Sequence, residues 1–420
     1  MRKKPQNCDN GSRKLRIAVL GLRGFPGVQG GIERHCRELY PRLAGLNCDI
    51  TLLARKSYVP QQHPYTYKNV KIIPLWAPRM KNLEAICHTA IGVFWLSKHR
   101  NDYDILHIHG IGPSLLAYPA RRLNFRLVIT NHGPDYRRQK WGPLAKAMLR
   151  LGERLGARHA YLIIAVSRQI RTLLLEKYES YAAYIPNGVN VPKKKPPGPV
   201  LLYFGLEPGR YFLAVGRLVP EKGFHDLLRA YEGLDTDWKL VIVGDADHED
   251  NYSKSLKKRA KNADGVVMTG FQTGEALAEL YSNAGLFVLP SYHEGLPIAG
   301  LEAMGCDLPI LLSDIPSNKE LAFPEETFSV GNIEELSQRL GAFLGNPPLF
   351  NSPQILAEKR KRLKTEFNWD TIAKKTSDLY RVIAKMPDNM GRDSLCRSQK
   401  GMAVKPGSNS LTADQEGEKE

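Results

Sequence analysis

Two glutamates, Glu294 and Glu302, stand eight positions apart in the segment VLPSYHEGLPIAGLEAMGCDLPILLSD. The apolar run 286–290 predicts a buried strand, and Pro297 suits the first turn of a following helix. Glu294 is then expected in the loop before the helix, and Glu302 about a turn and a half inside it. Open α/β sheets bind ligands at such corners. The two carboxylates are therefore expected to face one crevice, where acid and base roles of the glycosidase kind stay open.

Two cations, Arg217 and Lys222, lie in the short glycine-bounded loop GRLVPEKGF. An arginine fork and a lysine point charge together suit a diphosphate, and solvated loop charges are the alternative. The triplet TGF (269–271) ends another expected strand and is a candidate contact for a nucleobase.

A glycine-rich loop, GLRGFPGVQGG, leads from the first expected strand into a helix that starts near Ile32. Free N–H groups at a helix start attract phosphate, so Gly30 and Gly31 are candidate ligand contacts. The spacing of Gly21 and Gly24 departs from G-x-G-x-x-G, which disfavours a dinucleotide site. A turn needed only for packing is the alternative.

His107 and His109 alternate on the expected strand ILHIHG and so face the same side. His109 is at the carboxyl end, where site residues collect, and a core histidine is the alternative. Metal ligation needs a third ligand that the sequence does not display. Asp245 and Asp247 resemble a metal-binding D-x-D, although acidic residues are also common in turns that follow strands.

The segment from Arg121 to Arg158 carries ten Lys or Arg against Asp135 and Glu153. Its second half is expected to be a helix with Leu144, Met148, Leu151 and Leu155 on one side and Lys146, Arg150, Arg154 and Arg158 outside. Such a basic amphipathic surface suits an anionic membrane, and an ordinary solvated helix face is the alternative. Nucleic acid is disfavoured because few aromatic residues stand among the cations.

These residues must be positioned by strands, and strand-like apolar runs alternate with helical stretches in two sets. The first set is 15–22, 48–54, 70–75, 105–110, 125–133 and 160–167, and the second is 212–218, 239–245, 265–271, 286–292 and 308–314. The alternation predicts an α/β fold of two doubly wound, mostly parallel sheets. Between the sets, VPKKKPPGP (191–199) can be neither helix nor central strand and is expected to be a linker. We expect a ligand in the cleft between the two units.

Length, composition and charge are consistent with a soluble protein of two domains. A chain of 420 residues, 42% apolar and 25% charged, is typical of a soluble two-domain protein. The net charge of +17 favours anionic partners. The longest apolar stretch, 85–96, is too short to span a bilayer, and the six scattered cysteines suit reduced thiols. Residues 1–13 and 387–420 are expected to be disordered, the latter because it is poor in large apolar residues.

Taken together, the chain from about Arg16 to Lys385 resembles a family 4 retaining glycosyltransferase of GT-B architecture. The resemblance is carried by E-x7-E at Glu294 and Glu302, GRLVPEKG, IPNGV (185–189) and the GG loop. GLRGFPGVQGGIE and NHGPDYRRQKW further resemble a bacterial subgroup associated with exopolysaccharide, lipopolysaccharide and capsule assembly.

The resemblance implies a domain plan. Residues 14–190 would form the acceptor-side domain, 191–210 the linker, 211–368 the nucleotide-sugar domain, and 369–386 a helix that crosses back to the first domain. Both domains would be Rossmann-like and would face each other across the cleft.

The resemblance also implies residue roles. Glu302 would hold the ribose hydroxyls, Arg217 and Lys222 the diphosphate, and Glu294 would lie beside the donor sugar as nucleophile or positioning group. His109 would contact the donor sugar near the reacting carbon, while Gly30 and Gly31 would approach the phosphate or the acceptor. The remaining residues expected around the donor are Gly216, Gly244, Gly270, Phe271, Gly295 and Leu296.

The implied reaction moves a hexose or deoxyhexose from a UDP-, GDP- or dTDP-sugar to a lipid-linked or polysaccharide acceptor, with retention and without a metal or cofactor. It would take place at the cytoplasmic face of the membrane, with the protein bound peripherally. A sugar-nucleotide epimerase or hydrolase on the same fold, and a non-catalytic basic protein that bridges membrane and polysaccharide, are the alternatives.

Overall fold

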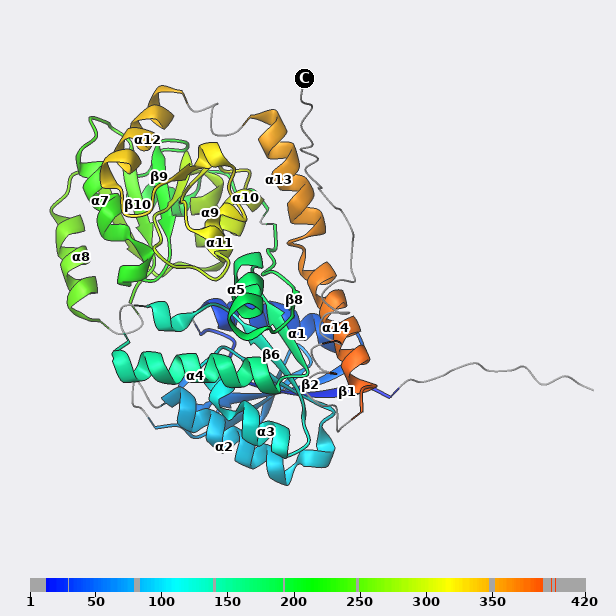
Figure 1. The fold of residues 1–420 in the computed structure, drawn as a ribbon. Helices are drawn as coiled ribbons and strands as arrows, with labels where there is room; N and C mark the ends of the chain where they lie inside the picture. Colours follow the sequence, from blue (N-terminus) through cyan, green and yellow to red (C-terminus); the bar gives the residue numbers. More distant parts are fainter. Residues whose placement is uncertain are drawn as a thin grey trace, which may run out of the picture.

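The computed structural model describes residues 13–28, 30–78, 84–138, 141–191, 193–246, 249–346 and 352–387, together with residues 394 and 397. Two mostly parallel sheets, each covered by helices, form two units that are stacked along the long axis of the molecule (Figure 1). The prediction of disordered ends stays a prediction, because residues 1–12 and nearly all of residues 388–420 lie outside the described residues.

The first unit has eight strands in the order β3-β4-β2-β1-β5-β6-β7-β8. The strands are β1 (Leu15–Leu20), β2 (Cys48–Arg55), β3 (Tyr65–Tyr67), β4 (Val70–Leu75), β5 (Ile105–His109), β6 (Arg126–Asn131), β7 (Leu162–Ala165) and β8 (Ala182–Tyr184). The helices are α1 (Gly31–Ala44), α2 (Glu84–Lys98), α3 (Ala117–Arg122), α4 (Pro143–His159) and α5 (Arg168–Tyr178), with 3-10 turns η1 (Lys56–Tyr58), η2 (Arg100–Asp102), η3 (Pro113–Leu116) and η4 (Asp135–Arg137). All pairings are parallel except the one between β3 and β4.

The second unit has six parallel strands in the order β11-β10-β9-β12-β13-β14. The strands are β9 (Tyr211–Val215), β10 (Lys239–Val243), β11 (Val266–Gly270), β12 (Leu286–Leu289), β13 (Ile310–Ser313) and β14 (Thr327–Phe328). The helices are α6 (Pro199–Phe204), α7 (Phe224–Glu232), α8 (Asn251–Lys261), α9 (Gly274–Ser282), α10 (Ile298–Gly305), α11 (Pro316–Lys319), α12 (Ile333–Gly345) and α13 (Pro353–Thr365), with 3-10 turns η5 (Pro220–Lys222) and η6 (Pro324–Glu326). The chain then continues into α14 (Trp369–Ala384).

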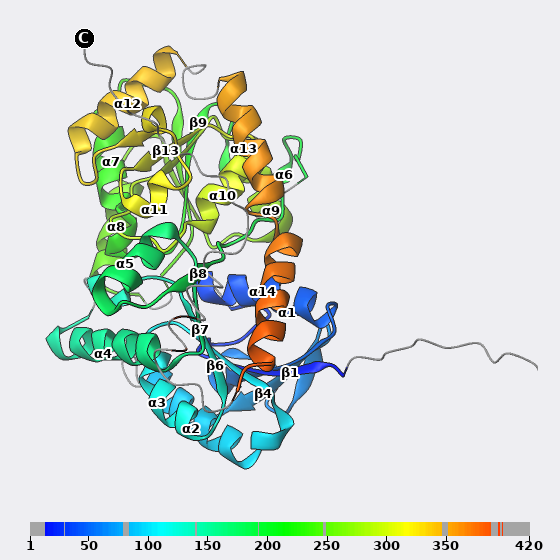
Figure 2. The same ribbon diagram turned by 45° about the vertical axis from the view of Figure 1, so that its right-hand side comes forward.

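The last two helices connect the units along one side of the molecule (Figure 2). Helix α13 lies beside the second unit, and α14 packs on α1 of the first. Ile372, Tyr380 and Ile383 of α14 are fully buried in the same apolar cluster as β1 and β2.

The doubly wound two-unit fold is confirmed, and each expected strand is present within a few residues. The short strands β3, β8 and β14 were not predicted, because two or three residues are too few to show a period. Helix α6 lies inside the expected linker 191–210. It starts at Pro199, which fits an N-terminal helical position because proline has no N–H to leave unpaired there.

The expected orientation of α4 is wrong for two of its leucines, whereas Leu155 packs on the core as expected. Leu144 is 77% exposed and Leu151 is 49% exposed, whereas Gly152, Glu153 and Gly156 are buried. A Cβ at Gly152 would clash with the carbonyl of Ile111, so the glycines let this helix approach its neighbours closely. Leu144 and Leu151 consequently share the outer face with the exposed arginines of the helix. None of the described helices is long and apolar enough to cross a membrane.

Candidate active site between the two units

Glu294 lies in the loop between β12 and α10 and forms an ion pair with Lys222. Nζ of Lys222 is 2.5 Å from Oε1 of Glu294, and the Ser291 hydroxyl donates to the same oxygen over 2.8 Å. Burial alone would raise the pKa of Glu294, but Lys222 and Ser291 outweigh it and the pKa is lowered. Two residues assigned to the donor from separate motifs are therefore in contact, and the carboxylate is ionised at neutral pH.

Glu302 lies inside α10 and is buried. The helix begins at Ile298 with Pro297 as its N-cap, one position before the expected first turn. The Tyr281 hydroxyl lies 3.3 Å from Oε2 of Glu302 and 3.2 Å from the carbonyl of Ala299, so its one proton can go to either, and Nη2 of Arg34 donates to Oε1. Arg34 belongs to α1 of the first unit, so the Glu302 carboxylate of the second unit accepts a hydrogen bond from the first unit.

The glycines around Lys222 allow close approaches of the backbone. Gly244 has a φ of 134°, and a Cβ there would clash with the carbonyl of Gly216, which follows β9. Gly270 also has a positive φ of 68° at the end of β11. The neighbouring Phe271 is 50% exposed, so its ring is accessible to a ligand.

The glycine loop of the first unit is tied to the start of α1. Oε1 of Glu33 accepts from the backbone N–H and from Nε of Arg23, each over 3.1 Å. Gly30 is the N-cap of α1, with a φ of 152°, and a Cβ at Gly31 would meet nothing within 4 Å. The position next to Gly31 is therefore open.

His109 is fully buried at the end of β5, and both of its ring nitrogens have protein partners. Nε2 lies 2.5 Å from the Tyr40 hydroxyl, and Nδ1 lies 2.9 Å from Nε2 of His132. His132 follows β6 and is only partly buried. His132, rather than His109, is therefore the more exposed member of the pair.

His107 extends this network to the crossover helix. Its Nδ1 lies 2.5 Å from the Tyr380 hydroxyl and 3.0 Å from the Tyr40 hydroxyl, and its Nε2 lies 2.8 Å from the Thr130 hydroxyl. Burial lowers the pKa of His107 to about 3 and raises the pKa of Tyr40 and of Tyr380. The network is therefore uncharged at neutral pH.

His35 of α1 completes a cluster with His109 and His132 that the sequence did not reveal. Nδ2 of Asn187 donates to the carbonyl of Leu296 over 2.9 Å, so Oδ1 of Asn187 accepts from Nδ1 of His35, also over 2.9 Å. His35, His109 and His132 each offer a nitrogen within 4.8 Å of the others, which is a geometry that could hold a metal ion. Hydrogen bonds already occupy the facing nitrogens of His109 and His132.

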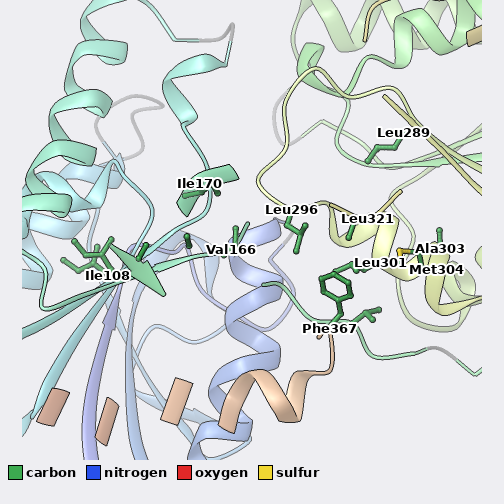
Figure 3. Packing of buried hydrophobic residues seen from close by; sticks show 14 of the residues in the cluster. Ile108, Val166, Ile170, Leu289, Leu296, Leu301, Ala303, Met304, Leu321 and Phe367 are labelled. Atoms are coloured by element: carbon green, nitrogen blue, oxygen red, sulfur yellow. The ribbon is translucent and has the colours of Figure 1, made fainter. Parts of the chain in front are cut away.

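The two units touch tightly at Gly295 and Leu296. A Cβ at Gly295 would clash with the carbonyl of His132, and Leu296 is buried. Figure 3 shows Leu296 beside Val166 of the first unit, with Leu301, Leu321 and Phe367 on its other side. Both residues therefore fix the interface rather than face an open cavity in this state.

Asp245 forms an ion pair with Lys257 over 2.8 Å, and Asp247 lies outside the described residues. A lysine partner accounts for the charge of Asp245 without a metal.

Two family models match the chain, one on each unit. Residues 29–193 match the Glycosyltransferase Family 4 model, and residues 205–366 match the model for Glycosyl transferases group 1.

Full-length relatives are similar over most of the chain. The alpha-maltose-1-phosphate synthase of Mycobacterium tuberculosis H37Rv is 27% identical over 88% of this chain and 100% of its own length. The putative teichuronic acid biosynthesis glycosyltransferase TuaC of Bacillus subtilis is 25% identical over 79% of this chain and 81% of its own.

Solved structures share the fold. Sucrose-phosphate synthase from Thermosynechococcus elongatus superposes with a TM-score of 0.76 at 22% identity, covering 88% of this chain and 99% of that one. Anabaena HepE in complex with UDP-glucose gives 0.71 at 18% identity, covering 88% and 100%. The fold is therefore GT-B.

Proposed function

Starting from a chain whose two units match two glycosyltransferase domain models, we propose that the protein is a retaining glycosyltransferase that moves a hexose or deoxyhexose from a nucleotide sugar to a lipid-linked or polysaccharide acceptor. The observation that carries the proposal is the contact of Lys222 with Glu294 on the corner that also bears Glu302. The UDP-glucose complex of the similarly folded HepE supports a nucleotide-sugar donor.

The chemistry of the step follows from charge. Departure of a nucleoside diphosphate leaves positive character on the sugar and negative charge on phosphate. Lys222 and Arg217 would stabilise the leaving group without a metal or cofactor. Glu294, held ionised beside Lys222, would stabilise or position the sugar. We favour front-face displacement, in which the leaving phosphate accepts the proton of the acceptor hydroxyl.

The histidine cluster would complete the sugar side of the site. Because His109 is enclosed by Tyr40 and His132, its effect on the donor would pass through His132. Burial lowers the pKa of His132 well below its usual value, so this imidazole would act as a neutral hydrogen-bonding group.

We further propose that the protein binds the cytoplasmic face of the membrane through α3 and α4. Leu144, Leu151, Arg154 and Arg158 fall on one exposed stripe of α4 at helical spacing. The half-exposed Tyr118 of α3 packs on His159 beside it. Exposed leucines flanked by arginines suit an anionic lipid surface.

Product analysis tests the reaction. A sugar nucleotide labelled at the anomeric carbon of its sugar should release nucleoside diphosphate, and the sugar should be transferred to an acceptor or hydrolysed. NMR should show that the anomer formed first has the same anomeric configuration as the donor. An inverted anomer would contradict retention, and conversion to an epimeric nucleotide sugar without an acceptor would favour the epimerase.

A further inference from the structure

We propose that Arg34 is a further residue of the donor site, one that holds the carboxylate of Glu302 until the ribose of a nucleotide displaces it. This inference rests on the proposed function, since it takes Glu302 as the ribose-binding group. It adds a residue of the opposite unit, which competes with the donor rather than binding it.

The contact joins the two units at the donor corner. Arg34 lies in the first turn of α1, 268 positions before Glu302, and its Nη2 donates to Oε1 of Glu302. The Glu302 side chain is 8% exposed and the Arg34 side chain is 37% exposed. Arg34 can therefore move toward solvent, whereas Glu302 stays in place and needs another partner when Arg34 leaves.

The exchange would take place at Oε1 of Glu302. Oε2 faces the Tyr281 hydroxyl at 3.3 Å, and burial keeps that hydroxyl protonated by raising its pKa. Oε1 is the oxygen that Arg34 holds. A ribose presents two neighbouring O–H donors, much as a guanidinium presents neighbouring N–H donors, and the deoxyribose of dTDP keeps one of the two. The ribose would thus replace Arg34 without leaving a buried anion unpaired.

Two other arginines of α1 pair with a carboxylate of their own helix, unlike Arg34. Arg37 pairs with Glu38 of its own helix at 3.6 Å, and Arg42 also pairs with Glu38. Among the described residues, Arg34 forms an ion pair with Glu302 alone. Arg34 is therefore placed to act on the donor site, and Arg37 is a matched control on the same helix.

Competition by Arg34 would weaken the binding of nucleotides but not the binding of pyrophosphate. A ligand that reaches only Arg217 and Lys222, such as inorganic pyrophosphate, leaves the Arg34–Glu302 pair intact. A nucleoside diphosphate must break the pair to seat its ribose. Removal of Arg34 should then favour nucleotides and leave pyrophosphate unaffected.

The test is a calorimetric measurement of Kd on the full chain. The ligands are pyrophosphate and whichever of UDP, GDP and dTDP binds the wild type most tightly. Arg34→Ala should tighten nucleotide binding about threefold or more, as loss of a partly exposed ion pair allows. Pyrophosphate binding should stay unchanged, and Arg37→Ala should change neither. In a Glu302→Ala background, the further change Arg34→Ala should have no effect on nucleotide binding.

The opposite result is equally clear. If Arg34→Ala weakens both the nucleotide and pyrophosphate, Arg34 is a phosphate ligand and the competition is contradicted. An unchanged nucleotide affinity would contradict it as well. If none of the three nucleotides binds the wild type at millimolar concentration, the donor site itself is wrong and the proposed function fails with it.

Discussion

Nδ1 of His109 lies 2.9 Å from Nε2 of His132, although the two rings come from the ends of neighbouring strands β5 and β6. One hydrogen bond thus makes a single unit of two residues 23 positions apart. The sequence singled out His109, but in the structure the ring of His109 is covered by His132.

This relationship predicts non-additive variants. His109→Ala and His132→Ala should each lower kcat/KM about a hundredfold to ten-thousandfold, and the double variant should be no worse than the more severe single one. Steady-state kinetics would measure this, with His99→Ala as a control outside the cluster. Multiplying effects would show that the two rings act separately.

The buried histidines predict a stability that depends on pH. Burial lowers the pKa of His35 to about 4 and of His107 to about 3, whereas unfolded histidines titrate near about 6.5. Between these values the unfolded chain binds more protons than the folded one, so the free energy of unfolding should fall as pH is lowered. Each such histidine contributes up to about 1.4 kcal/mol per pH unit.

Urea unfolding at several pH values between about 7 and 4.5 would check this dependence. His107→Gln should show a shallower slope than the wild type. A free energy of unfolding that stays constant across this window would mean that the histidines are not held neutral.

The contact at Gly295 predicts that the interface does not accept a side chain. Gly295→Ala should lower the free energy of unfolding by about 1–3 kcal/mol, because the new Cβ would clash with the carbonyl of His132. Gly142→Ala is the matched control, since a Cβ there meets nothing within 4 Å. Equal denaturation midpoints for both variants would refute the tight contact.

The outer face of α4 predicts lipid binding. Leu144→Glu should reduce flotation with anionic vesicles severalfold, because it removes an exposed apolar contact and adds a repelled charge. Salt should also weaken the binding of the wild type, since surface charges are screened. Leu202→Glu on α6 changes an equally exposed leucine and should have no effect. Binding that survives Leu144→Glu would place the docking surface elsewhere.

The strands could be predicted because buried parallel strands are short, nearly continuous apolar runs between turn residues. The orientation of α4 could not, since a count of large apolar residues overlooks a packing face made of Gly152 and Gly156. The lack of a side chain at Gly152 lets the helix lie close to Ile111, and the lack of one at Gly156 lets it lie close to Ser114 and Ile129.

The donor half of the site could largely be predicted, because Lys222, Glu294 and Glu302 come from compact motifs in one unit. The network around His109 could not, because His35, Tyr40 and Tyr380 reach it from two helices that only the fold brings together. His132 had a visible signal, since it directly follows a strand whose neighbour ends in His109.

The most direct test of the account is the rate at which nucleoside diphosphate is released from the preferred sugar nucleotide by Lys222→Ala and Glu302→Ala, with Lys254→Ala as an exposed control on α8. Both site variants should retain the circular dichroism of the wild type and lose at least about a hundredfold in rate, since each removes a charged contact to the donor. The control should match the wild type. Near-wild-type rates in both site variants would contradict the donor site proposed at this corner.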